Sequence, residues 1–241
     1  FLGSWASGYL ILATNAWMQH PVGYEILENG KFVLENFSAL FSNPWLLPAF
    51  LHNQIASLVT SSFVVASIGA FYVLRDKNIE YGKLFLKTGI IFGLVSSLLL
   101  AFPTGDWNAK NVAKHQPAAF AAMEGIFETE EKGAEIVLIG QPDMVRKKLD
   151  NKIAVPNILS FLTYQEWDKQ IPGMDQFKKE ELPDNIPALY YSYHIMVGLG
   201  TIFIAIMGLA VFFLWRKKLF SMKPLLWIIM FLVPFPYIAN I

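Results

Sequence analysis

The sequence contains no cysteine and carries few charges outside one segment. The absence of cysteine excludes disulfides, thiolate-ligated iron–sulfur clusters, cysteine-ligated zinc and covalent haem attachment through C-x-x-C-H. Any cofactor must therefore be held by histidine, methionine or carboxylate side chains. Basic and acidic residues are equal in number, 19 of each, so the chain lacks the basic face that a nucleic-acid partner requires.

Long uncharged stretches dominate the rest of the chain. Hydrophobic residues make up 54% of the 241 residues and charged residues 16%, most of them between Asp106 and Asp184. A bilayer crossing needs about 20 apolar residues, and several such stretches would leave a water-soluble protein without a polar surface. We therefore predict an all-α integral membrane protein with five transmembrane helices. The uncharged stretches are residues 1–24, 36–74, 88–105, 186–215 and 224–241.

Basic residues in the short loops predict the orientation, because Lys and Arg are retained on the cytoplasmic side. The loop after the first stretch contains three acidic residues and one lysine, so it belongs outside. The turns after the second and fourth stretches are basic and belong inside. These assignments place successive loops on alternating sides of the membrane only if residues 103–187 lie outside. Residues 103–187 would then form an external domain between two membrane parts, 1–102 with three helices and 188–241 with two. The basic residues are Arg75, Lys77, Lys83 and Lys87 in one turn, and Arg216, Lys217, Lys218 and Lys223 in the other.

Both ends of the sequence fall inside apolar stretches. Phe1 has no basic flank of the kind that a signal peptide carries. The last residues before Ile241 are also apolar. We therefore expect the chain to be an internal segment of a longer protein.

The external segment is expected to be partly helical. Pro117 suits the first position of a helix, after which Phe120, Met123, Glu124 and Phe127 recur on one face. Glu124 would then lie on an apolar face. It is either a functional carboxylate or one more charge in the acidic run that follows it.

The histidines decide which cofactor the chain could hold. The sequence has four, and no two have the spacing by which one helix binds two stacked haems. His52 stands alone in an uncharged stretch, where an ionisable residue is costly and suggests function; it is either a metal ligand or a hydrogen-bonded interfacial residue. Met196 is a second candidate ligand, although methionine also fills gaps in packing. Both enter from the outer side, so they could face one haem in the outer leaflet.

His194 cannot readily bind the same iron as Met196. Two steps along a helix rotate a side chain by about 200°, so the two point in nearly opposite directions. His194 is expected at the outer interface, either near a haem propionate or in ordinary packing. His20 and His115 have no partner at ligand spacing and receive no role.

Several short motifs occur in a specific order around the external segment. They are Asn15-Ala-Trp-Met-Gln-His-Pro-Val-Gly23, Leu51-His52, Gly105-Asp106 with Gln116-Pro117 and Ala121-Ala-Met-Glu-Gly125, and Tyr193-His-Ile-Met-Val197. Together they resemble the large subunit (subunit I) of the cytochrome bd quinol oxidase family. The likeness extends over essentially the whole chain.

The resemblance implies a specific arrangement of cofactor and substrate. The five helices would be the fourth to eighth of nine, and residues 103–187 the quinol-binding loop. His52 and Met196 would be the axial ligands of a low-spin haem b, and Glu124 would take part in quinol oxidation. His/Met ligation raises the haem potential relative to two histidines.

The resemblance also implies partners and a location. The substrate would be a membrane quinol, either ubiquinol or menaquinol. A second large membrane subunit, and small single-span subunits, would complete an oxidase that transfers electrons from quinol to oxygen. The location would be the plasma membrane of a bacterium or archaeon, with the long loop outside.

Two departures limit what this segment is expected to do. The family often has a lysine five residues before the loop glutamate, where this chain has Ala119, so Lys110 or Lys114 would have to contact the quinol. The ligands of a second haem b and of the oxygen-reducing haem d would precede residue 1, so the segment alone should not reduce oxygen. An electron-transfer subunit without oxygen chemistry and a haem-free transporter or scaffold remain alternative functions.

Overall fold

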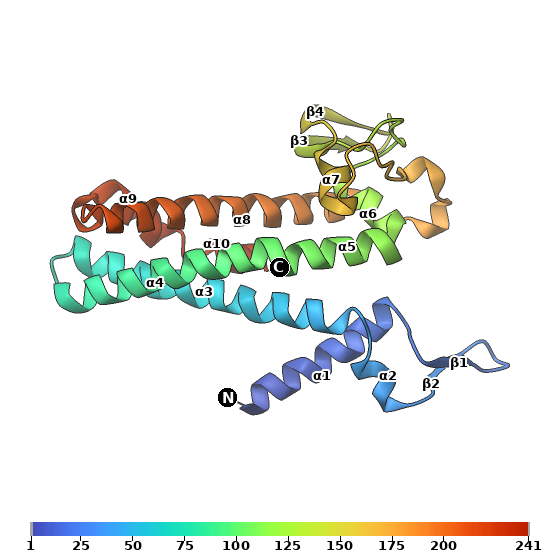
Figure 1. Ribbon diagram of the computed structural model, residues 1–241, viewed down its shortest axis with the longest axis horizontal. Coiled ribbons are helices and arrows are strands. Elements are labelled where there is room, and N and C mark those ends of the chain that lie inside the picture. The colour runs from blue at the N-terminus through green and yellow to red at the C-terminus, as the bar shows by residue number, and fades with distance from the viewer. Residues whose placement is uncertain (1, 241) are drawn as a thin grey trace.

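The computed structural model describes residues 2–240 and is mostly helical (Figure 1). Three of its helices are long and apolar enough to cross a membrane. They are α3 (Leu46–Leu74), the continuous helix of α4 (Ile79–Leu99), η1 (Leu100–Gly105) and α5 (Asp106–His115), and α8 (Ile186–Trp215). The fold therefore confirms a mostly helical chain with three helices suited to a membrane.

The first and last uncharged stretches form shorter helices. The first contains α1 (Leu2–Gln19), and the last contains α9 (Lys223–Phe231) and α10 (Phe235–Ala239), separated by a turn at residues 232–234. Pro234 and Pro236 have no backbone N–H, which disfavours one uninterrupted helix there. Membrane crossing by these two stretches stays a prediction, and their end residues, Phe1 and Ile241, lie outside the described part of the chain.

Helices α3 and α4 pack backbone against backbone. A Cβ atom on Gly69 would collide with the backbone of Leu86, and one on Gly89 with the backbone of Ala66. Glycine is required at both positions because a side chain would push the helices apart. The two helices therefore form one closely packed pair.

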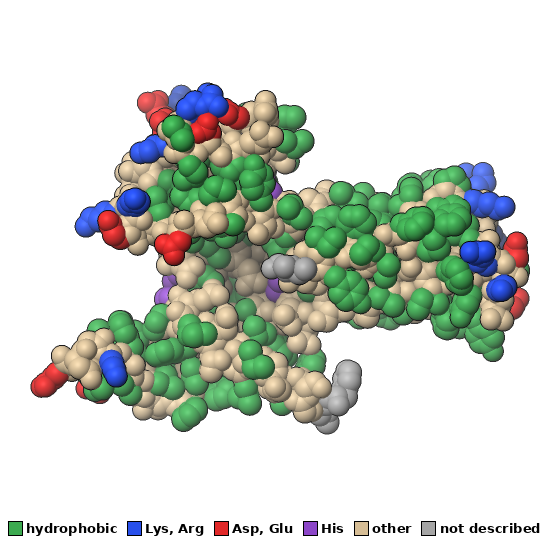
Figure 2. Space-filling view, turned by 180° about the vertical axis from the view of Figure 1, so that it is seen from behind, with side chains coloured by type: hydrophobic (Ala, Val, Ile, Leu, Met, Phe, Trp, Pro, Cys, Tyr) green, Lys and Arg blue, Asp and Glu red, His purple; other side chains and the backbone are tan. Residues whose placement is uncertain are grey.

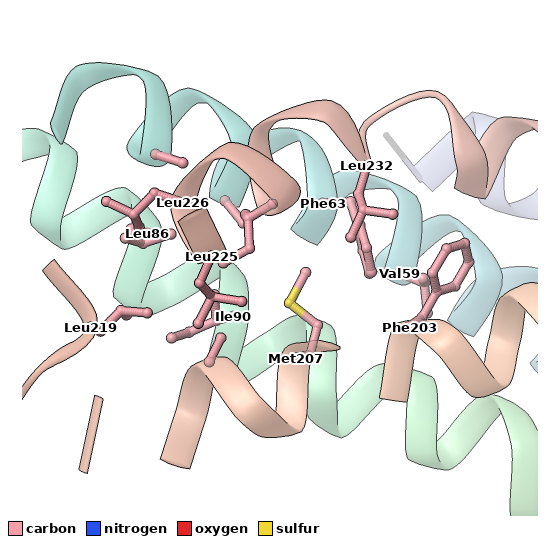
Figure 3. Packing of buried hydrophobic residues seen from close by; sticks show 14 residues of the cluster. Val59, Phe63, Leu86, Ile90, Phe203, Met207, Leu219, Leu225, Leu226 and Leu232 are labelled. Carbon is pink, nitrogen blue, oxygen red and sulfur yellow. The ribbon is translucent and has the colours of Figure 1, made fainter. Parts of the chain in front are cut away.

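A hydrophobic core joins this pair to α8 and α9. Phe63 of α3, Ile90 of α4 and Met207 of α8 are completely buried in it, together with Leu226 of α9 (Figure 3). The ring of Phe63 lies 4.7 Å from the ring of Phe203. This aromatic contact marks the place where α3 and α8 meet.

The two basic turns lie at the same end of the long helices. The ammonium group of Lys83, near the start of α4, lies 5.7 Å from the ring centroid of Phe220 in η4 (Leu219–Ser221), after α8. The β3–β4 hairpin and α6 lie at the opposite end (Figure 1). The arrangement in space thus separates the basic turns from the long charged segment.

The long charged segment has a core of its own. Its buried apolar residues include Phe120, Ala121, Leu159, Ile171 and Met174. Its elements are α6 (Pro117–Glu124), β3 (Ile136–Asp143), β4 (Lys148–Val155), α7 (Ile158–Tyr164), η2 (Met174–Gln176) and η3 (Lys179–Glu181).

The expectation of an all-α chain misses two antiparallel hairpins. One pairs β1 (Tyr24–Ile26) with β2 (Phe32–Leu34), before the short helix α2 (Phe37–Phe41), and the other pairs β3 with β4. In the second, Asp143 Oδ1 accepts hydrogen bonds at 2.9 Å from the N–H groups of Val145 and Arg146, which fixes the turn. The β-branched residues of Ile-Val-Leu-Ile at the start of β3 are the sequence signal for this hairpin.

The second long helix does not end where the charges begin. We expect the external segment to start at residue 103, yet the helix continues through Pro103 to His115. A π-helical turn at η1 accommodates the proline, which has no N–H to donate. Residue 103 therefore marks a change from apolar to charged composition, and the helix itself continues into the charged segment.

Candidate functional site

Glu124 is the last residue of α6 and is only 2% exposed. The helix begins at Pro117, as its sequence predicts, and ends because Gly125 adopts a left-handed conformation with φ of 74°. A Cβ atom on Gly125 would lie 2.7 Å from the Tyr190 ring, so glycine also lets α6 end against α8. The apolar surroundings expected for Glu124 are confirmed, whereas Phe127 lies beyond the helix; the role of Glu124 stays a prediction.

The carboxyl group of Glu124 has one close polar partner on another element. The hydroxyl group of Tyr193, on α8, forms a hydrogen bond with it. Burial raises the pKa of Glu124 to about 7, and the hydrogen bond from Tyr193 opposes this by lowering it. A carboxyl group with this pKa changes protonation state near neutral pH, which suits it to general acid–base chemistry.

A cavity of about 420 Å³ adjoins Glu124 on the side of the β3–β4 hairpin. Three further acidic residues line it, Glu128, Glu130 and Glu135. Basic residues from the hairpin, among them Arg146, Lys148 and Lys152, face the same space. The buried carboxyl group is therefore adjacent to a polar cavity rather than sealed in an apolar core.

His52 lies in the second turn of α3 and is half-buried. Its Nδ1 atom lies 3.3 Å from the Thr104 hydroxyl oxygen, which itself donates to the carbonyl groups of Leu99 and Leu100, each at 3.2 Å. Because the Thr104 proton is used in those bonds, Nδ1–H of His52 is the donor to Thr104. The neutral ring then has its free electron pair on Nε2, which is the form a metal binds.

Met196 lies on α8 and is 36% exposed. Beside it, Cβ atoms built on Gly198 and Gly200 meet nothing within 4 Å. This part of α8 therefore has free space along it. Gly200 is four residues after Met196 and so lies on the same face of α8, whereas Gly198, two residues after it, faces away. The exposed thioether and the space at Gly200 leave room for a large planar group.

His194 packs against the start of α8 rather than beside Met196. Its ring stacks on the Tyr190 ring at 3.9 Å between centroids, and its Nδ1–H donates to the Tyr190 carbonyl oxygen at 2.9 Å. Its Nε2 atom is buried and has no hydrogen-bond partner within residues 2–240. A propionate contact for His194 stays a prediction.

His52 and Met196 lie on the same side of the Phe63–Phe203 contact. His52 precedes Phe63 by eleven residues and Met196 precedes Phe203 by seven, which corresponds to roughly 16 Å and 10 Å along the helices. Within residues 2–240 no hydrogen bond joins the two side chains. The molecule is hollowed between the charged segment, the α1 side and the long helices (Figure 2).

The residues present fit a haem better than a bare metal ion. Among residues 2–240, no group of three or more His, Asp and Glu side chains could hold a metal ion. A haem needs from the protein only axial ligands, which His52 Nε2 and the Met196 sulfur would supply. The space beside Gly200, on the same face of α8 as Met196, agrees with a macrocycle there.

Two parts of the site are not apparent from the sequence. Tyr193 belongs to a recognised motif but has no predicted partner, and Thr104 follows a proline that suggests a helix end. His20 and His115 also receive no role, yet their ring centroids lie 4.4 Å apart, joining the end of α1 to the end of α5.

Comparison with known proteins gives consistent matches over the chain. The family model described as cytochrome bd terminal oxidase subunit I matches residues 1–241. Cytochrome bd ubiquinol oxidase subunit 1 of Bacillus subtilis (strain 168) is 34% identical over 251 residues, which cover 99% of this chain and 52% of that protein. Cytochrome bd-II ubiquinol oxidase subunit 1 of Escherichia coli (strain K12) is 30% identical over 182 residues, covering 75% of this chain and 35% of that protein.

A solved structure has the same fold. The structure of bd oxidase from Geobacillus thermodenitrificans superposes with a TM-score of 0.87 at 25% sequence identity, over 99% of this chain and 54% of that chain. The present chain thus spans about half the length of this structure and of the Bacillus subtilis relative.

Proposed function

Because the chain belongs to the cytochrome bd terminal oxidase subunit I family, we propose that it forms the quinol-oxidising part of a cytochrome bd-type quinol:oxygen oxidoreductase. The observation that carries the proposal is Glu124, a buried carboxyl group with a pKa of about 7 beside a polar cavity. Such a group accepts a proton from a quinol hydroxyl group at neutral pH. The named activity of the Bacillus subtilis and Escherichia coli relatives supports the same substrate class, a membrane quinol.

Glu124 acts as the general base in this proposal. Its carboxylate accepts the proton of a quinol hydroxyl group as the quinol gives up electrons. The Tyr193 hydroxyl group holds the carboxylate in place and favours its charged form. The apolar residues around α6 exclude water from the other side of the carboxyl group, so its proton exchanges mainly through the cavity.

His52 and Met196 hold a low-spin haem b in this proposal. The haem, when bound, supplies one-electron transfer. Thr104 keeps the His52 proton on Nδ1 and so directs Nε2 towards the iron. The open side of α8 at Gly200, which shares a face with Met196, supports this assignment. His194 contributes a polar ring near the outer end of α8.

We further propose the membrane arrangement. The chain crosses a bacterial plasma membrane five times, with residues 1–102 and 188–241 in the bilayer and residues 103–187 as the external quinol-binding loop. The basic turns at one end of the long helices, opposite the β3–β4 hairpin, support this orientation. Much of the apolar surface of α3, α4 and α8 is exposed and would contact lipid, a second large membrane subunit and small single-span subunits.

The test uses the full-length protein purified with its partner subunits. Addition of a quinol under anaerobic conditions should reduce a low-spin haem, measured as a reduced-minus-oxidised spectrum. Oxygen should then be consumed when air is admitted. A preparation without haem would show that the chain is a transporter or scaffold, and haem reduction without oxygen consumption would leave only electron transfer.

A further inference from the structure

The cavity beside Glu124 is lined mainly by charged side chains, with a few apolar ones such as Ile126, Val137 and Leu149. Charged side chains from the segment before β3 and from the hairpin line it, including Glu130, Glu135 and Lys152. Water occupies polar cavities of this size, whereas the isoprenoid tail of a quinol would have to displace it from charged groups at considerable cost. The cavity therefore suits movement of protons between Glu124 and solvent.

Glu130 and Glu135 form a carboxyl pair in this cavity. Both side chains line the cavity, the charge of Glu135 acts on Glu130, and Lys152 forms an ion pair with Glu135. A negative charge close to a carboxyl group favours its protonated form. The Glu135 side chain is 21% exposed and that of Lys152 is 43% exposed. Glu135 therefore reaches bulk solvent and also lines the same cavity as Glu124.

The electrostatic surroundings favour a proton on this pair. Burial raises the pKa of Glu130, the charge of Glu135 raises it further, and Lys152 opposes both effects. The remaining charged groups that face the cavity are occupied elsewhere or exposed: Arg146 pairs with Asp143 and Asp150, Lys148 pairs with Asp150, and Glu128 and Lys147 are exposed.

We propose that the Glu130–Glu135 pair receives, through the cavity, the proton that Glu124 takes from quinol and releases it to solvent on the hairpin side. The inference rests on the proposed function. Each quinol O–H bond that breaks gives its proton to the Glu124 carboxylate, and one electron leaves the quinol for a haem with each proton, so that two such steps convert the quinol to the quinone. Water in the cavity carries the proton to the pair, Lys152 stabilises the carboxylate left after release, and Glu124 returns to its carboxylate form. Glu130 and Glu135 are thus positioning residues for the proton and do not touch the quinol.

The experiment compares Glu130→Gln with Glu131→Gln in the full oxidase. Both variants lose one negative charge, but Glu131 is exposed and does not line the cavity. Quinol-driven oxygen consumption of Glu130→Gln should fall about tenfold at pH 7, less than the loss of the base itself. Imidazole, a small buffer base, should restore much of this rate. Glu131→Gln should behave as the unmodified protein, and an artificial electron donor that bypasses the quinol should support equal rates in all three.

Several results would overturn the inference. Glu130→Gln could keep the full rate, or it could be slow without any rescue by imidazole or by Glu130→Asp, which would indicate a structural role. Should Glu130→Gln fail to assemble with its haems, Glu135→Gln tests the same pair. Glu124→Gln, measured in parallel, tests the proposed function separately from the proton exit. Full activity in that variant contradicts the proposed function. Loss of activity in Glu124→Gln together with an unaffected Glu130→Gln contradicts only the proton exit.

Discussion

The hydroxyl group of Tyr193 forms a hydrogen bond with the buried carboxyl group of Glu124, and so joins the start of α8 to the end of α6. Tyr193 precedes Met196 by three residues, and residues with this spacing lie on neighbouring parts of one helix face. The proposed proton acceptor and the proposed haem ligand are therefore linked through a single turn of α8. In this arrangement, the proton and the electron leave the quinol close to the same helix.

Tyr193→Phe should shift the pH dependence of quinol oxidation. The hydrogen bond lowers the pKa of Glu124, so its loss raises that pKa above its value of about 7. Less of the carboxyl group is then in the carboxylate form at pH 7, and kcat/KM should fall roughly threefold there, with little change at pH 9. Tyr191→Phe, at an exposed position of the same helix, is the control. Superimposable pH profiles for Tyr193→Phe and the unmodified protein would contradict the role of this hydrogen bond.

Glu124→Gln should lower quinol-driven turnover by about 10²–10⁴-fold, the usual contribution of a general base. In the unmodified protein the rate should rise as the pH passes about 7, because only the carboxylate accepts a proton. The residual rate of the variant should lack this rise. Haem spectra and oxygen consumption with a bypassing donor should not change. An equal loss in Glu131→Gln would mean that negative charge in general, and not this base, determines the rate.

His52→Ala or Met196→Leu should remove the low-spin haem signal while the chain still inserts, because each deletes one axial ligand of the same iron. A reduced-minus-oxidised spectrum of the purified protein measures this. Met207→Leu is the matched control, since Met207 lies on the same helix but is buried in the core. The assignment is wrong if either ligand variant keeps an unchanged low-spin band.

Trypsin added outside intact cells should cut the chain at the tip of the β3–β4 hairpin. Arg146 and Lys147 lie in this turn, and the neighbouring Val145 is 92% exposed. The basic turn at residues 216–223 should be spared, because it faces the cytoplasm in the proposed orientation. Inside-out vesicles should give the opposite pattern, measured by the sizes of the fragments. Cleavage of residues 216–223 in intact cells would reverse the orientation.

Local patterns explain why part of this molecule is predictable from sequence. The apolar stretches that form α3 and α8 meet the length of a membrane helix by themselves, and Glu124 is identified from the spacing of its apolar neighbours on α6. The Glu124–Tyr193 and His52–Thr104 hydrogen bonds join residues far apart in the chain, so no local pattern indicates them. The external segment is expected to start at Pro103, and no local pattern indicates the π-helical turn that carries the helix past this proline.

The close contact of α3 and α4 has a consequence for the order of assembly. Gly69, Leu86, Ala66 and Gly89 make this contact, and all four lie within one short stretch of sequence joined by a tight turn. The pair is therefore complete once α4 has been synthesised, before α8 exists. We expect α3 and α4 to enter the bilayer as a finished unit, against which the later helix docks to complete the proposed haem site.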